Sequence, residues 1–96
     1  MASPVYSAEQ NGLPLSEEVS DLYPYIRAIP DSVLQRITIL FDDYYCTAEP
    51  VVQAAMSEIK GDCFYTTSKY DSALYYLLQA RVIYKQLQDS AALAIN

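Results

Sequence analysis

Two thiols and an adjacent pair of aspartates are the first candidates for chemistry in this sequence. Cys46 and Cys63 could act as nucleophiles or metal ligands, and Asp42 and Asp43 could transfer protons or bind a cation. The chain has no histidine, so neither thiol has the usual base that activates it near neutral pH. Adjacent helical residues point about 100° apart, so the two aspartates do not converge on one ligand. We therefore expect a protein that is not an enzyme and holds no metal or other cofactor.

The two cysteines also bear on the cellular compartment. Both lie in apolar, helix-like segments and lack the short spacing of a metal-binding motif. We expect both thiols to be buried and reduced, and the sequence leaves a disulfide as the alternative. No apolar run approaches the roughly 20 residues that span a bilayer, and no leader-like segment begins the chain. The expectation is a cytoplasmic protein without a membrane partner.

Tyrosine usage suggests binding. The chain has ten tyrosines and no tryptophan, with adjacent pairs at Tyr44–Tyr45 and Tyr75–Tyr76. One member of each pair can fill the core while the other faces the surface, where tyrosine is a rigid, amphipathic interface anchor. Tyr45 and Tyr75 are therefore candidate protein-binding residues, with core filling as the alternative.

The net charge of −6 disfavours nucleic acid and anionic membrane surfaces as partners. Residues 1–62 hold ten acidic and three basic side chains, whereas residues 63–96 hold two and three. An acidic front half and a near-neutral back half favour a basic protein partner.

The elements that must position these residues are helical. Residues 1–14 contain Pro4, Gly12 and Pro14 without periodicity, which predicts a flexible N-terminal arm. Residues 15–96 are expected to form one helical domain, because 96 residues support a single core and only two are glycine.

Four helices are predicted from apolar residues at three-to-four spacing. The first, from Ser16 to Ile26, is short or kinked because Pro24 lacks a backbone donor. The second follows Pro30, capped by Asp31 or Ser32, although the β-branched stretch 37–40 leaves a strand as the alternative. The third runs from about Pro50 to Thr66, and the fourth, opened by a Ser68–Asp71 capping box, reaches at least Leu87. The expected inward residues of the second helix are Val33, Leu34, Ile37, Leu40, Phe41, Tyr44 and Tyr45. Those of the third helix are Val51, Ala54 or Ala55, Ile59, Cys63 and Phe64. Those of the fourth helix are Tyr70, Ala73, Leu74, Leu77, Ala80, Arg81, Tyr84 and Leu87.

The last two helices carry small residues at positions that permit close packing. Gly61, Ala73 and Ala80 would let two helices cross closely, while Phe64, Tyr70 and Leu77 fill the gaps beside them. In this spacing residues 54–87 resemble a single tetratricopeptide repeat. Ser57, Lys60 and Lys85 depart from that pattern. The resemblance implies an antiparallel helical hairpin that binds protein, stacked on the upstream helices or on a partner subunit.

The resemblance also implies a binding face. It places Glu58, Asp62, Tyr65 and Thr66 on a groove that is often basic in the family, whereas here it is acidic. A basic peptide, or an arginine that binds a carboxylate and stacks on Tyr65, would suit this face. A solvated helix face without a ligand is the alternative.

The sequence therefore predicts an all-α bundle of about four helices with a C-terminal tetratricopeptide-like hairpin. Its expected function is protein binding as an adaptor, assembly factor or chaperone-like subunit. A small acidic inhibitor that imitates nucleic-acid charge and a structural subunit of a homo-oligomer are the alternatives.

The last predicted helix also resembles a second family, through Tyr70, Ala73, Leu74 and Tyr76. These residues are similar to the second helix of microtubule-interacting-and-trafficking domains, which continue into a third helix.

Overall fold

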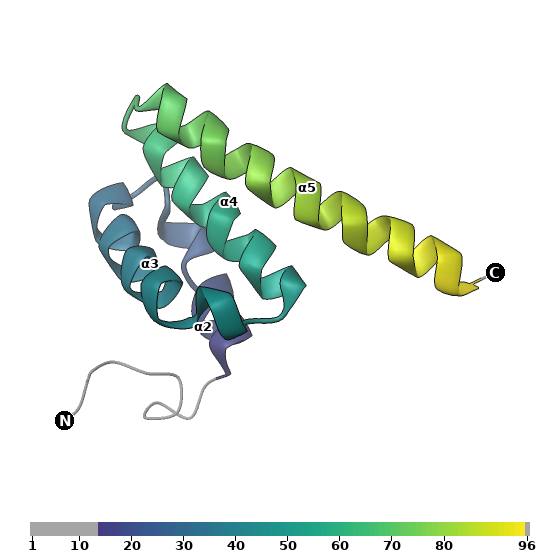
Figure 1. Ribbon diagram of the computed structural model, residues 1–96. Helices are drawn as coiled ribbons and strands as arrows, with labels where there is room; N and C mark the ends of the chain where they lie inside the picture. The colour runs from purple at the N-terminus through teal and green to yellow at the C-terminus, as the bar shows by residue number, and fades with distance from the viewer. Residues whose placement is uncertain (1–13, 96) are drawn as a thin grey trace.

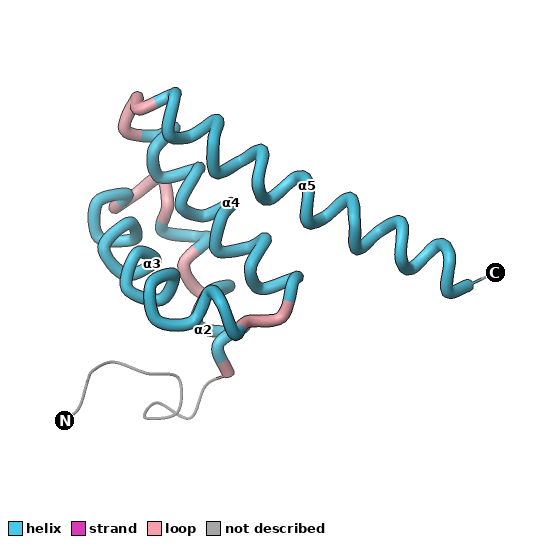
Figure 2. The backbone as a smooth tube through the Cα atoms, viewed as in Figure 1, coloured by secondary structure: helices cyan, strands magenta, loops and turns pink. Residues whose placement is uncertain are grey.

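The computed structural model describes residues 14–95, with side chains described from 14 to 89. The predicted N-terminal arm lies outside this range except for Pro14. Four α-helices occur within it, α2 (Leu15–Ser20), α3 (Pro30–Tyr44), α4 (Pro50–Thr66) and α5 (Tyr70–Ile95), with 3-10 turns η1 (Tyr23–Tyr25) and η2 (Tyr45–Thr47). The described residues contain no strand, so the all-α class is confirmed (Figures 1 and 2). None of these helices has the length and apolar character needed to cross a membrane.

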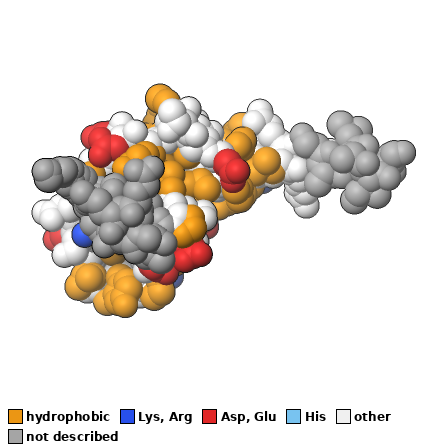
Figure 3. Space-filling model, turned by 90° about the horizontal axis from the view of Figure 1, so that it is seen from below, with side chains coloured by type: hydrophobic (Ala, Val, Ile, Leu, Met, Phe, Trp, Pro, Cys, Tyr) orange, Lys and Arg blue, Asp and Glu red, His pale blue; other side chains and the backbone are white. Residues whose placement is uncertain are grey.

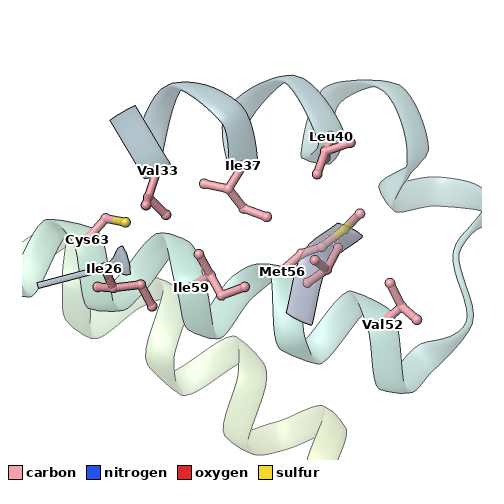
Figure 4. Packing of buried hydrophobic residues seen from close by; sticks show 9 residues of the cluster. Ile26, Val33, Ile37, Leu40, Val52, Met56, Ile59 and Cys63 are labelled. Carbon is pink, nitrogen blue, oxygen red and sulfur yellow. The ribbon is translucent and has the colours of Figure 1, made fainter. Parts of the chain in front are cut away.

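The main core lies between α3 and α4. Figure 4 shows side chains of α3 pointing towards those of α4, with Ile26 closing one end. The core side chains of α3 and of α4 are spaced three and four residues apart, so they lie on one stripe of each helix. The labelled residues are Ile26, Val33, Ile37, Leu40, Val52, Met56, Ile59 and Cys63. Each large aliphatic side chain buried here contributes roughly 1.5–3 kcal/mol. The stretch 37–40 is thus helical, and the α3 stripe is as predicted.

The second contact joins α4 to α5, which lies on the side of α4 away from α3 (Figure 1). Gly61 is buried, and Ala73 and Ala80 are only 2% and 3% exposed. A Cβ added to Gly61 would lie 3.1 Å from the backbone nitrogen of Leu77. The predicted close approach of an antiparallel helix pair is therefore present, and small side chains permit it.

Ser68 forms the turn between these helices, and its role differs from the prediction. Its φ is +67°, and its N–H donates to the Tyr65 carbonyl at 3.0 Å, while the Lys69 N–H donates to the Phe64 carbonyl at 2.8 Å. This pair of bonds is a Schellman motif, which satisfies the free carbonyls at the end of a helix. Ser68 therefore ends α4 in a left-handed conformation and does not open a capping box for α5.

Prolines define the starts of α3 and α4. Pro30 and Pro50 are the first residues of their helices, where a missing donor costs nothing. The predicted cap at Asp31 or Ser32 is wrong, because Ile29 is the N-cap residue and makes no side-chain cap bond. The first predicted helix is shorter than expected. It ends at Ser20, and Pro24 lies within the separate turn η1.

The inward faces of the last two helices also differ from the prediction. Val52 is buried where Val51 was expected, and Val51 is 50% exposed. Tyr70 and Leu74 are 59% and 58% exposed, and Arg81 is exposed too. The reason is that α5 packs mainly on α4, so only a narrow stripe of it is covered. Viewed from below, apolar side chains reach the surface of the rounded body and of the extending helix (Figure 3).

Candidate protein-binding grooves

The first groove lies between η1 and the C-terminal half of α4. It has a volume of about 230 Å³ and is lined by Tyr23, Pro24, Ile26, Arg27, Asp62, Tyr65 and Thr66. We call it the Asp62 groove. Its three α4 residues lie on one flank because Tyr65 and Thr66 follow Asp62 by three and four residues, about one helical turn. Tyr65 is 60% exposed, so its ring is accessible to a partner. Three of the four residues that the repeat resemblance implied thus share one groove.

Glu58, the fourth, has a different environment. Its Oε1 accepts hydrogen bonds from the Tyr23 hydroxyl at 2.8 Å and from the Tyr84 hydroxyl at 3.1 Å. Burial, followed by the bond to Glu58, raises the pKa of Tyr23 far above its usual range, so this hydroxyl remains a donor. Glu58 therefore connects α4 to η1 and to α5 through hydrogen bonds, and it does not line the Asp62 groove.

The electrostatics of the Asp62 groove are mixed. Burial raises the pKa of Asp62, and the Glu58 carboxylate raises it further, whereas Arg27 lowers it. The Thr66 hydroxyl donates to the main-chain carbonyl of Asp62, four residues earlier in the helix, at 2.8 Å, so it leaves the Asp62 carboxylate available. A cation that entered the groove would favour the ionised form of Asp62.

The second groove holds the two tyrosines predicted for binding. It has a volume of about 270 Å³ and is lined by Phe41, Tyr45, Ser57, Tyr75, Tyr76 and Gln79. We call it the tyrosine groove. The rings of Phe41 and Tyr45 stack at 4.3 Å between centroids, and Tyr75 meets Tyr76 edge-on at 5.1 Å. Tyr75 is 59% exposed beside a half-buried Tyr76, as predicted for an adjacent pair. Tyr44 and Tyr45 are both half-buried, so the prediction is wrong for that pair.

Lys60 connects the helices around the tyrosine groove. Its Nζ lies 4.4 Å from the ring centroid of Phe41 on α3 and 4.8 Å from that of Tyr76 on α5. Cation–π contacts of this kind are worth about 0.5–2 kcal/mol. The sequence marked Lys60 only as a departure from the repeat pattern. Its role depends on two rings 35 residues apart in the chain, which no local pattern reveals.

Ser57 was also missed by the sequence argument. It is 1% exposed, and its hydroxyl has no hydrogen-bond partner among the described residues. Buried hydroxyls are usually bonded, so this position is unusual. The only signal in the sequence was a small polar residue where the repeat pattern has a large one.

The cysteines are both free, and one prediction about them is wrong. Cys63 is fully buried, and burial raises its pKa to about 11, so its thiol is unreactive. Cys46 is exposed. It lies in η2, the short turn that follows α3.

The fold and its grooves define a small all-α bundle whose C-terminal helix pair borders two open grooves. Neither a protein family, nor a curated protein, nor a solved structure matches this chain. The resemblance to a tetratricopeptide repeat therefore stays an interpretation of the spacing, and function is argued from the grooves themselves.

Proposed function

We propose that this chain is a non-enzymatic protein-interaction module, an adaptor or assembly subunit, that binds a basic segment of another protein in the Asp62 groove. The observation that carries the proposal is the shared position of a half-buried carboxylate and an exposed aromatic ring, those of Asp62 and Tyr65. An arginine can satisfy both groups at once. Its guanidinium forms two hydrogen bonds with the carboxylate while its flat face lies on the tyrosine ring.

The size of the groove favours a side chain over a small molecule. Small-molecule sites usually measure about 300–1,000 Å³. The Asp62 groove measures about 230 Å³, which suits one or two side chains of a larger partner. Exposed Tyr75 at the tyrosine groove supplies a second contact surface of the kind that protein interfaces use.

Electrostatics supports a cationic partner in a specific way. Burial and the Glu58 carboxylate raise the pKa of Asp62, and Arg27 lowers it, but the pKa stays above its usual value. Arg27 therefore offsets only part of the rise. An incoming arginine offsets that destabilisation of the ionised carboxylate. Binding of a basic peptide is therefore expected to strengthen as pH rises through the pKa of Asp62.

The test is an NMR titration of isotope-labelled protein with a short arginine–glycine peptide. We expect amide shifts to concentrate at Arg27, Asp62, Tyr65 and Thr66. Asp62→Asn should weaken binding about tenfold, the effect of roughly 1.4 kcal/mol. Asp42→Asn, which changes an exposed acid on α3, is the matched control and should bind as the native protein does.

A second pair of variants separates the two grooves. Tyr65→Ala should weaken the peptide and Tyr75→Ala should not. A glutamate–glycine peptide of equal length that bound equally well would refute the proposal. So would an Asp62→Asn variant with native affinity, because the carboxylate would then have no part in recognition.

A further inference from the structure

The helix α5 has apolar side chains on two opposite faces, and only one of them is covered. Ala73 and Ala80 face α4 and are buried. On the opposite face, Leu74, Leu78 and Val82 follow one another at four-residue intervals and are 58%, 48% and 54% exposed. The outer stripe is defined as Asp71, Leu74, Tyr75, Leu78, Val82 and Lys85. All six point within about 60° of Leu78 on an ideal helix.

Nothing in the described part of the chain accounts for this face. An exposed helix normally presents polar side chains to water, and a row of large apolar ones marks an interaction surface. The row is also continuous, because residues four apart are neighbours on a helix surface. It therefore offers a second helix a continuous line of contact.

We propose that the outer stripe is a homodimer interface, in which α5 packs antiparallel against α5 of a second copy around a two-fold axis at Leu78. Two-fold symmetry places the same surface on both sides, so the stripe must complement itself. About this axis Leu78 meets the second copy's Leu78, and Leu74 meets the second copy's Val82. Apolar side chains thus face apolar side chains along the centre of the contact.

The charges at the ends of the stripe identify a second copy as the occupant. Asp71 stands seven residues before Leu78, and Lys85 stands seven after it. Antiparallel pairing therefore sets Asp71 opposite the second copy's Lys85 at both ends. Parallel pairing would set like charges against each other, which disfavours it.

Lys85 remains available for this pairing. Its Nζ lies 3.9 Å from Asp89 of its own helix, but the two side chains are 74% and 64% exposed. Exposed ion pairs of this kind hold their partners weakly. Lys85 can therefore bind the second copy's Asp71 without the loss of a buried interaction.

The area of the stripe sets the expected strength. With its flanking side chains it offers on the order of 500 Å² per chain, so the pair would bury about 1,000 Å². That is near the lower limit for a specific interface and predicts a weak, concentration-dependent dimer. The Asp62 groove stays open in it, because none of the residues that line this groove belongs to the outer stripe. The inference is thus independent of the proposed basic partner.

The test is sedimentation equilibrium of the full chain across a concentration range from about 1 μM to about 1 mM, where a micromolar dissociation constant is measurable. We expect the native chain to pass from monomer to dimer. Leu78→Glu places two carboxylates together at the axis and should raise the dimer dissociation constant at least tenfold. Ile39→Glu is the matched control, since Ile39 is 47% exposed on α3, outside the stripe. It should dimerise as the native chain does.

Charge reversal then tests the orientation. Asp71→Lys and Lys85→Asp should each weaken the dimer, and the double variant should restore it, because opposite charges face each other again. Circular dichroism of each variant checks that it is folded. A chain that remains monomeric throughout the range would overturn the proposal. A dimer indifferent to Leu78→Glu, or to the single reversals, would overturn it equally.

Discussion

The contact between Gly61 and Leu77 allows a prediction whose sign depends on the tertiary structure. An ideal Cβ on Gly61 would lie 2.7 Å from Cγ, 2.8 Å from Cδ2 and 3.1 Å from the backbone nitrogen of Leu77. Carbon atoms in contact prefer about 3.5–4.0 Å, so Gly61→Ala forces α4 and α5 apart. A change of rotamer moves Cδ2 but not the backbone nitrogen.

Two effects of opposite sign set the size of the change. Alanine is favoured over glycine within a helix by about 1 kcal/mol, which stabilises the variant. Overpacking costs about 1–3 kcal/mol, and atoms close to the Leu77 backbone place this case towards the upper end. The net result is a loss of about 1–2 kcal/mol in the free energy of unfolding, or a Tm lower by roughly 5–15 °C for a domain of this size.

Thermal and urea unfolding of the variant measure this loss, and a double-mutant cycle assigns it. In a Leu77→Ala background the two side-chain contacts are gone and only the 3.1 Å approach to the backbone nitrogen remains, so Gly61→Ala should be close to neutral. The coupling between the two sites should therefore reach about 2 kcal/mol. If Gly61→Ala alone raised stability by the 1 kcal/mol or so of its helix propensity, the close approach of α4 and α5 would be refuted.

Three further predictions test individual residues. Burial raises the pKa of Glu18, which is 4% exposed and whose carboxylate oxygens lack hydrogen-bond partners among the described residues, while Arg36 opposes the shift. The folded state therefore holds this proton more tightly, and the protein loses stability as pH rises from about 4 through the raised pKa. Glu18→Gln should gain about 1 kcal/mol near pH 7 and little near pH 4 in urea unfolding, and an equal gain at both would contradict the assignment. Ser68→Gly should gain about 1 kcal/mol because glycine adopts a positive φ without strain, whereas Ser68→Ala should gain nothing; equal Tm values for both would contradict the role of φ. Alkylation followed by mass spectrometry should modify Cys46 quickly and Cys63 only after unfolding, and equal rates would show that Cys63 is not buried.

Several local features were predictable from the sequence because they depend on neighbouring residues. Pro50 and Thr66 were predicted as the bounds of a helix, and α4 has those bounds. Proline at a first helical position and three-to-four apolar spacing are both effects of one or two turns. The covered face of α3 followed for the same reason, since a single apolar stripe leaves only one way to face a core.

The candidate sites were only partly predictable. Asp62, Tyr65 and Thr66 share a flank of α4 by spacing alone, but the other wall of their groove comes from η1. Glu58 belonged to the same flank, yet its carboxylate binds Tyr23 and Tyr84, 35 residues before it and 26 after it. Which acid faces a groove and which is held inside depends on these distant hydroxyls.

The sequence by itself determined that the chain is helical, that Pro50 begins a helix, and that Gly61, Ala73 and Ala80 let two helices touch. The tertiary structure decided which of the two apolar faces of α5 is covered. Helical periodicity is a property of neighbours along the chain and describes both faces equally well. Burial of a face depends on which other helix packs against it. Within the described residues, α4 covers the face of α5 that carries Ala73 and Ala80, while the face that carries Leu74, Leu78 and Val82 remains exposed.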